Sequence, residues 1–215
     1  MAGYGRSSVS HVGRRQADLA AYYDQEAPAR DQRDIDAARR ARLEEFAALL
    51  RAERRTRLIE VGCGPGHDAV RFAAHGLRVV GADLSHAHAQ LAARRIGTAV
   101  QASLFDLPFR AASFDAGWTM STLVHVADDE FAAAMRSIVA SLRPLSPLAI
   151  GLWGGSDFEG IAEFDTILPR RFFSLRTHER ARSMLAEHGS VERFDTWSSE
   201  ATTWQYQFAI VRTPE

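Results

Sequence analysis

The chain has 215 residues, 46% of them hydrophobic, which suffices for one substantial α/β domain and is scant for two. Its formal net charge of −1 argues against a nucleic-acid binder, which would carry a strongly basic surface. The sequence contains no lysine, which excludes Schiff-base catalysis by that residue, and its single cysteine, Cys63, excludes an intrachain disulfide.

No apolar stretch reaches the roughly 18 residues that a membrane-spanning helix needs, and the N-terminus lacks the apolar core of a signal peptide. These features predict a cytoplasmic protein with no membrane or nucleic-acid partner. Residues 1–15 are rich in Gly, Ser and Arg without an apolar period, so we expect a flexible N-terminus there.

Residues 16–55 predict leading helices. A short helix is expected over 16–23, ended by Pro28 and the charged residues after it. A longer amphipathic helix is expected over 35–54, because apolar residues recur on one face at helical spacing. That face comprises Leu43, Phe46, Ala47 and Leu50.

Strand and helix patterns then alternate along the chain. Strands are expected over 57–61, 77–82, 99–102, 114–119 and 148–153, with helices over 67–75, 85–95 and 128–142. Such alternation predicts right-handed crossovers and a parallel sheet covered on both faces. Two closely spaced alternating strands, 191–198 and 203–212, predict an antiparallel hairpin. The expected fold is therefore α/β and Rossmann-like: a doubly wound, mostly parallel seven-stranded sheet with an antiparallel C-terminal hairpin.

The first strand ends in a glycine-rich turn, "EVGCGPG", at residues 60–66, and a helix follows. Glycines let the backbone adopt positive φ and let a ligand approach closely, while helix N-terminal N–H groups favour a carboxylate or phosphate. The dinucleotide fingerprint needs a third glycine where this chain has His67. The pattern is instead acid-x-G-x-G-x-G, with Glu60 at the end of the strand.

This segment resembles motif I of the class I S-adenosylmethionine (SAM)-dependent methyltransferases. The resemblance implies one such domain over residues 16–215, with SAM as cofactor and S-adenosylhomocysteine (SAH) as product. Asp83, at the end of the second strand, would bind the ribose diol, and Leu84 would flank the adenine. Ser103 stands where the family usually has an adenine-binding Asp, four residues before Leu107. The implied cofactor-binding residues are Glu60, Gly62, Cys63, Gly64, Gly66, Asp83, Leu84, Ser103, Leu104, Thr119 and Met120.

Other residues are candidates for the acceptor side of such a site. His125, after the fourth strand, is either a catalytic base or a structural histidine. The long segment 154–175 resembles a substrate lid, and Arg171 within it is suited to an acceptor carboxylate. His86 and His88 diverge on a helix, which disfavours a metal site, and no metal is expected. The predicted substrate-binding residues are Tyr22, Tyr23, Trp118 and Arg171.

The resemblance thus implies a bacterial enzyme, a monomer or homodimer, that methylates an O or N atom of a small-molecule acceptor. Two alternatives remain open. One is a SAM-using enzyme that transfers no methyl group, such as an intramolecular cyclase or lyase. The other is a non-catalytic subunit that binds SAM and interacts with a partner. This alternative stays open because Ser103 replaces the Asp that the family usually has.

Overall fold

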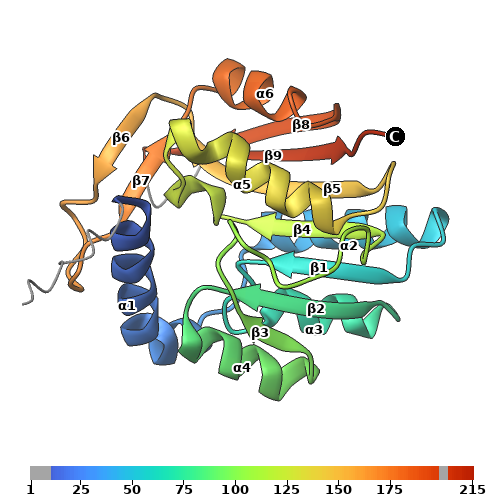
Figure 1. Cartoon of the computed structure of the whole chain (residues 1–215), viewed down its shortest axis with the longest axis horizontal. Coiled ribbons are helices and arrows are strands. Elements are labelled where there is room, and N and C mark those ends of the chain that lie inside the picture. Colours follow the sequence, from blue (N-terminus) through green and yellow to red (C-terminus); the bar gives the residue numbers. More distant parts are fainter. Residues whose placement is uncertain (1–10, 199–202) are drawn as a thin grey trace, which may run out of the picture.

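A computed structural model describes residues 11–198 and 203–215, and a seven-stranded sheet forms its centre (Figure 1). The strand order is β3-β2-β1-β4-β5-β9-β8; the first five strands are parallel, whereas β9 runs antiparallel to β5 and β8. The predicted fold class is confirmed. The strands are β1 Arg57–Val61, β2 Arg78–Asp83, β3 Ala99–Gln101, β4 Ala116–Met120, β5 Pro147–Gly154, β8 Ser190–Ser198 and β9 Gln205–Arg212.

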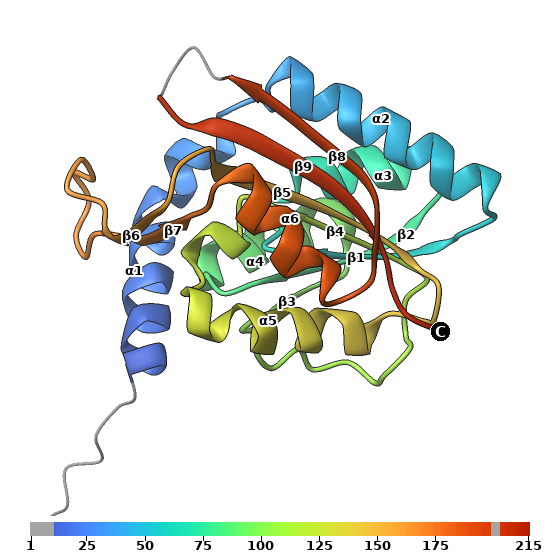
Figure 2. The same ribbon diagram turned by 90° about the horizontal axis from the view of Figure 1, so that it is seen from above.

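Helices cover both faces of this sheet (Figure 2). One face packs against α2 (Ala37–Ala52) and α3 (His67–Ala74), and the other against α5 (Asp128–Ser141) and α6 (His178–Ala186). α4 (His86–Ile96) packs on β2 and β3. Buried strands contribute to both layers, since successive side chains point to opposite faces: Leu58 joins the α2 side and Ile59 the α5 side.

The predicted apolar face of α2 is confirmed, because Leu43, Phe46, Ala47 and Leu50 are all buried. This helix begins after Asp36, whose carboxylate accepts a hydrogen bond from the Arg39 N–H at 2.9 Å. An N-cap of this kind satisfies one of the donors that an α-helix leaves unpaired at its start.

The leading helix differs from the expectation. α1 runs without interruption from His11 to Asp31, so it begins before the predicted residue 16 and passes through Pro28. Residues 11–15 are helical rather than flexible, and residues 1–10 lie outside the described residues. Pro28 removes one helical hydrogen bond near the end of the helix. Tertiary contacts outweigh that loss, because Tyr22, Glu26 and Ala27 are buried.

The segment 154–175 forms a small antiparallel sheet of its own. β6 (Phe158–Ile161) pairs antiparallel with β7 (Phe172–Leu175). This hairpin and α1 lie at the edge of the main sheet where the parallel strands β1, β2 and β4 end (Figure 1). Within residues 11–198 and 203–215, no helix is both long enough and apolar enough to cross a membrane.

Candidate functional site

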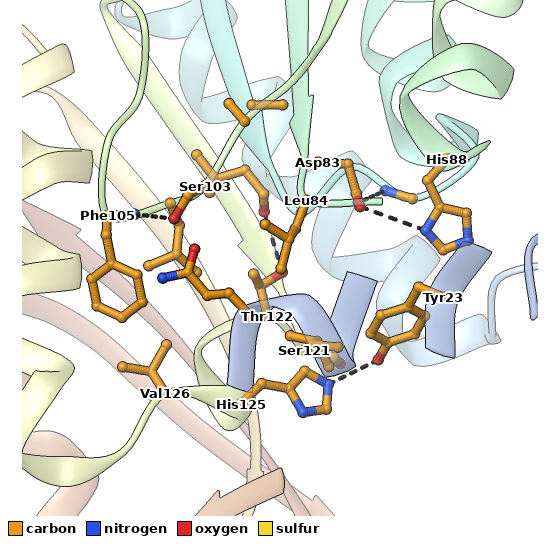
Figure 3. A pocket seen from close by; sticks show the side chains of 18 of the residues that line it. Tyr23, Asp83, Leu84, His88, Ser103, Phe105, Ser121, Thr122, His125 and Val126 are labelled. Carbon is orange, nitrogen blue, oxygen red and sulfur yellow. Dashed lines mark hydrogen bonds and ion pairs between the residues drawn. The ribbon is translucent and has the colours of Figure 1, made fainter. Parts of the chain in front are cut away.

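A pocket opens at the carboxyl ends of the parallel strands, beneath α1 (Figure 3). Open α/β sheets bind ligands at this edge, because the loops after the strands diverge there. The pocket has about 840 Å³ of empty volume, part of it continuous with solvent. Its walls come from α1, the glycine turn, the ends of β2, β3 and β4, and the short 3₁₀ helix η1 (Leu123–His125).

The glycine turn forms the inner wall. Gly62 and Gly64 both have positive φ, 72° and 53°, and both line the pocket. The Gly62 N–H donates to Ala82 O at 2.7 Å, which ties the end of β1 to the end of β2. A Cβ on Gly62 would lie 1.9 Å from Thr122 Oγ1, so only glycine fits here.

Asp83 at the end of β2 has its carboxylate fixed by two backbone donors. Gly64 N–H donates to Oδ2 at 2.8 Å, and Ser85 N–H donates to Oδ1 at 2.9 Å. Ser85 caps α4, because its side-chain oxygen accepts a hydrogen bond from the His88 N–H. The carboxylate therefore faces the pocket in one orientation with lone pairs left for a ligand.

The structure brings together about half of the predicted site residues. The pocket is lined by Gly62, Gly64, Asp83, Leu84, Ser103, Leu104, Met120, Tyr23 and His125. It is not lined by Glu60, Cys63, Gly66, Thr119, Tyr22, Trp118 or Arg171.

Two residues of the glycine turn, Cys63 and Gly66, pack against neighbouring elements and do not line the pocket. The Cys63 side chain lies against β2, since a Cβ on Gly81 would meet Cys63 Sγ at 2.8 Å. Burial raises the pKa of the Cys63 thiol well above its usual value, as expected for a space-filling rather than a nucleophilic cysteine. Gly66 permits close packing of α3 on α4, because an added Cβ would lie 3.0 Å from the Ala92 backbone.

Glu60 is 1% exposed and is buried beside Asp68 and Arg39. Its Oε2 has no hydrogen-bond partner among the described residues. Burial, reinforced by the charge of Asp68, raises the pKa of Glu60 well above its ordinary value. Arg39 donates to Asp68 at 2.8 Å through Nε. Glu60 thus lies behind the pocket wall rather than on it.

The prediction that Trp118 contacts an acceptor is wrong. Its side chain is fully buried among Phe46, Phe72 and Phe208, and its Nε1–H donates to Asp68 Oδ2 at 2.8 Å. Trp118 and Met120 point to the same α2–α3 side of β4, because they are two residues apart. Only Met120, the last residue of the strand, lies far enough along it to line the pocket.

His125 of η1 and Tyr23 of α1 form a hydrogen-bonded pair on the pocket wall. His125 Nδ1 lies 2.8 Å from the Phe172 carbonyl, which can only accept, so Nδ1 carries the proton. Burial, assisted by the charges of Arg171 and Arg30, lowers the pKa of His125 to about 4. The ring is therefore neutral at pH 7, and Nε2 accepts from the Tyr23 hydroxyl at 2.8 Å.

Arg171 joins the 154–175 hairpin to α1 without lining the pocket. Its Nε donates to Asp165 at 2.9 Å, and its guanidinium lies 4.3 Å from the centre of the Tyr22 ring. Tyr22 in turn donates to Asp165 at 3.4 Å, and Arg171 Nη1 donates to the Tyr23 hydroxyl at 3.4 Å. The two predicted substrate residues Tyr22 and Arg171 thus hold Tyr23 in place.

Sequence reasoning missed several residues of the pocket wall. α1 supplies an apolar strip, Val12 and Leu19, which an earlier helix start would have revealed by its period. Arg15, also from α1, forms an ion pair with Glu130 of α5 across the pocket. His88 of α4 also lines the pocket. Among the described residues, no group of three or more His, Cys, Asp or Glu side chains could hold a metal ion.

Comparisons with known proteins agree with this architecture. A family model described as a methyltransferase domain matches residues 58–145. The O-methyltransferase resE of Aspergillus sclerotiorum is 36% identical over 115 residues, 49% of this chain and 43% of that protein. The chain spans about half the length of the curated relatives it matches.

Two solved structures share the fold. The 1,6-didemethyltoxoflavin-N1-methyltransferase of Burkholderia thailandensis, with bound 1,6-didemethyltoxoflavin and SAH, superposes with a TM-score of 0.71 at 20% identity, covering 100% of this chain and 94% of that one. The [4+2]-cyclase SpnF superposes with a TM-score of 0.67 at 19% identity, covering 91% and 96%.

The seven-stranded sheet, in which β9 runs antiparallel to its neighbours, gives the chain the Rossmann-like α/β fold of these solved structures. The family match marks residues 58–145, from β1 to the residues before β5, as similar to a methyltransferase domain.

Proposed function

We propose that the protein transfers a methyl group from SAM to an O or N atom of a small-molecule acceptor. The proposal rests on a single observation: the two walls of the pocket differ in chemistry. A glycine turn and a fixed carboxylate, Asp83, form the inner wall, while α1 and the Tyr23–His125 pair form the outer one. The named activity of resE, an O-methyltransferase, supports an oxygen acceptor.

The inner wall suits the cofactor. Gly62 and Gly64 expose backbone beside the turn, and Asp83 offers carboxylate lone pairs to a ribose diol. Leu84, Ser103 and Leu104 would border the adenine, with Ser103 a weaker acceptor than the usual carboxylate. SAM, when bound, supplies a methyl group already activated by a sulfonium, so much of the catalysis required of the protein is alignment.

The outer wall suits the acceptor. Tyr23 and His125 supply polar atoms there, next to the apolar Val126 and Phe105. His125 stays a proposed catalytic residue, but its Nε2 lone pair is engaged by the Tyr23 hydroxyl, so a proton would reach it through Tyr23. We also propose a bacterial, cytoplasmic protein, active as a monomer or homodimer without nucleic acid.

Titration calorimetry with SAH, followed by a screen of hydroxylated and N-heterocyclic small molecules with methyl-labelled SAM, tests this function. We expect micromolar or tighter SAH binding and label transfer to at least one acceptor. Absence of SAH binding at high micromolar concentration would overturn the proposal, and ATP and NADH serve as control ligands.

A second candidate is a non-methylating SAM-binding enzyme, such as a cyclase. The observation that favours it is the poor basicity of His125, whose pKa of about 4 leaves little proton-accepting power at pH 7. A pericyclic ring closure needs no base. Product formation that proceeds equally with SAH in place of SAM would identify this case, whereas a methyltransferase requires SAM.

A further inference from the structure

Arg176 is a buried cation to which the proposed function gives no task. It follows β7, does not line the pocket and is only 1% exposed, whereas arginine side chains are almost never fully buried unless they are paired. Its backbone is fixed to the main sheet, because its carbonyl accepts hydrogen bonds from Gln207 Nε2 at 2.8 Å and from the Gly155 N–H at 3.0 Å. The side chain therefore extends from a fixed point.

The guanidinium of Arg176 joins three segments of the chain. Nε donates to the carboxylate of Asp128, in the first turn of α5, at 2.7 Å. Nη2 donates at 2.8 Å to the carbonyl of Val126, which directly follows η1, and Nη1 lies 3.5 Å from the carbonyl of Leu123, the first residue of η1. Nη1 also donates to the Ser174 carbonyl of β7 at 3.1 Å. One side chain thus holds both ends of η1 and links it to α5 and β7.

An apolar side chain could not replace these contacts. Burial lowers the pKa of Arg176 below its ordinary value, although the charge of Asp128 opposes this shift. Burying an ion pair costs desolvation energy, and apolar residues of similar volume often stabilise a fold equally well. The guanidinium differs from them in supplying several donors in one rigid plane, which fixes the orientation of the carbonyls that it contacts.

The segments that Arg176 joins are those that orient His125. η1 carries the backbone of His125, and β7 supplies the Phe172 carbonyl, which lies 2.8 Å from His125 Nδ1. Figure 3 shows the His125 ring beside the Tyr23 hydroxyl, to which its Nε2 is hydrogen-bonded. A shift of η1 against β7 would lengthen the bond to Phe172 and turn Nε2 away from Tyr23.

We propose that Arg176 is a positioning residue for the acceptor side of the site: it fixes η1 against α5 and β7, and thereby sets the orientation of the His125–Tyr23 pair. This inference rests on the proposed function, since the pair lies where the acceptor is proposed to bind. It predicts that Arg176 controls the state of the His125 ring and leaves cofactor binding unchanged.

An NMR titration of the histidine ring nitrogens tests the inference on the ligand-free protein, with His125→Gln used to assign the signal. Wild type should show one neutral tautomer, with hydrogen on Nδ1, and a pKa of about 4. In Arg176→Met we expect both tautomers and a pKa of at least about 5, because a loosened η1 exposes the ring to water. Arg176→Lys should behave in the same way, since lysine keeps the charge but not the planar set of donors.

Arg180→Gln is the matched control. Arg180 forms an ion pair with the same Asp128 carboxylate but, among the described residues, bonds no carbonyl of η1, so this variant should keep the wild-type titration. Asp128→Asn is a milder second variant, because it weakens the anchor of the Arg176 guanidinium and keeps an oxygen for Nε. It should move the titration of His125 in the same direction as Arg176→Met.

Calorimetry and thermal unfolding separate positioning from folding. Arg176→Met should melt at a lower temperature but bind SAH within about twofold of wild type, because the glycine turn and Asp83 share no contact with it. With an acceptor from the screen, kcat should fall at least about tenfold, since misplacement of the pair disturbs alignment.

A lower melting temperature with unchanged tautomer and pKa of His125 would show that Arg176 is purely structural; it would overturn the inference and leave the proposed function intact. Failure of the wild-type protein to bind SAH would overturn the proposed function itself.

Discussion

His125 has the clearest consequence for pH dependence among the single residues. Its folded-state pKa of about 4 lies below the ordinary value of 6.5, because burial disfavours the imidazolium. As the pH falls below 6.5, the unfolded chain binds a proton that the folded chain refuses until the pH nears 4. The stability associated with neutral His125 is therefore present above pH 6.5 and is lost between 6.5 and 4.

We expect this loss to reach at most about 3 kcal/mol, and to be absent in His125→Gln, whose amide can still donate to the Phe172 carbonyl. The measurement is urea unfolding of both proteins at pH 7.5, 6, 5 and 4. Parallel pH profiles of the two proteins would contradict the lowered pKa.

Asp83 provides a second prediction for a single residue. Asp83→Asn places an amide N–H₂ against one of the two backbone donors, Gly64 N–H or Ser85 N–H, and removes the charge beside the proposed ribose site. We expect SAH affinity to fall at least about tenfold, since a hydrogen bond to a charged group contributes about 1.5–3 kcal/mol. Calorimetry measures this. Unchanged affinity would show that the ribose lies elsewhere.

At the scale of the elements, the tight packing of the glycine turn can be tested with a pair of glycine-to-alanine variants. Gly62→Ala combines a positive φ with a collision, because its Cβ would lie 1.9 Å from Thr122 Oγ1. Gly76→Ala has a similar φ of 84° but no atom within 4 Å of the added Cβ. Both should lower the free energy of unfolding by about 1 kcal/mol through backbone strain, and Gly62→Ala by several kcal/mol more.

Denaturant unfolding of the two alanine variants isolates the steric contribution of the turn. Similar losses would mean that η1 and Thr122 can move aside freely, so that the turn is less tightly packed than its contacts indicate.

At the scale of the elements, the sequence pattern predicted the bounds of the strands and helices around the sheet well, but it predicted those of α1 poorly. Apolar period and glycine position predicted β1, α2 and the final hairpin within two residues of their bounds. They could not predict that α1 continues through Pro28, because the contacts that stabilise it come from Ser85 of α4 and from residues of the 154–175 hairpin.

At the scale of the whole molecule, ligand binding should stabilise the fold. The pocket is bordered by α1, α4, α5 and four strand ends, so a ligand there contacts elements far apart in sequence. SAH at about 100 times its dissociation constant should add about 2.7 kcal/mol, which raises the melting temperature by about 5–10 °C in a chain of this size. Differential scanning fluorimetry measures the shift. An equal rise with ATP would speak against a specific site.

The sequence by itself determined the sheet, the glycine turn and the acid at the end of β2. These depend on local period, on turns that only glycine can form and on a spacing fixed by one helix and one strand. Only the tertiary structure decided which side chains reach the pocket. Trp118 is covered by the aromatic side chains of α2, α3 and β9, and Glu60 lies behind the pocket wall. His88 and Tyr23 line the pocket because α4 and α1 pack together. Such contacts join residues distant in sequence, and no local pattern encodes them.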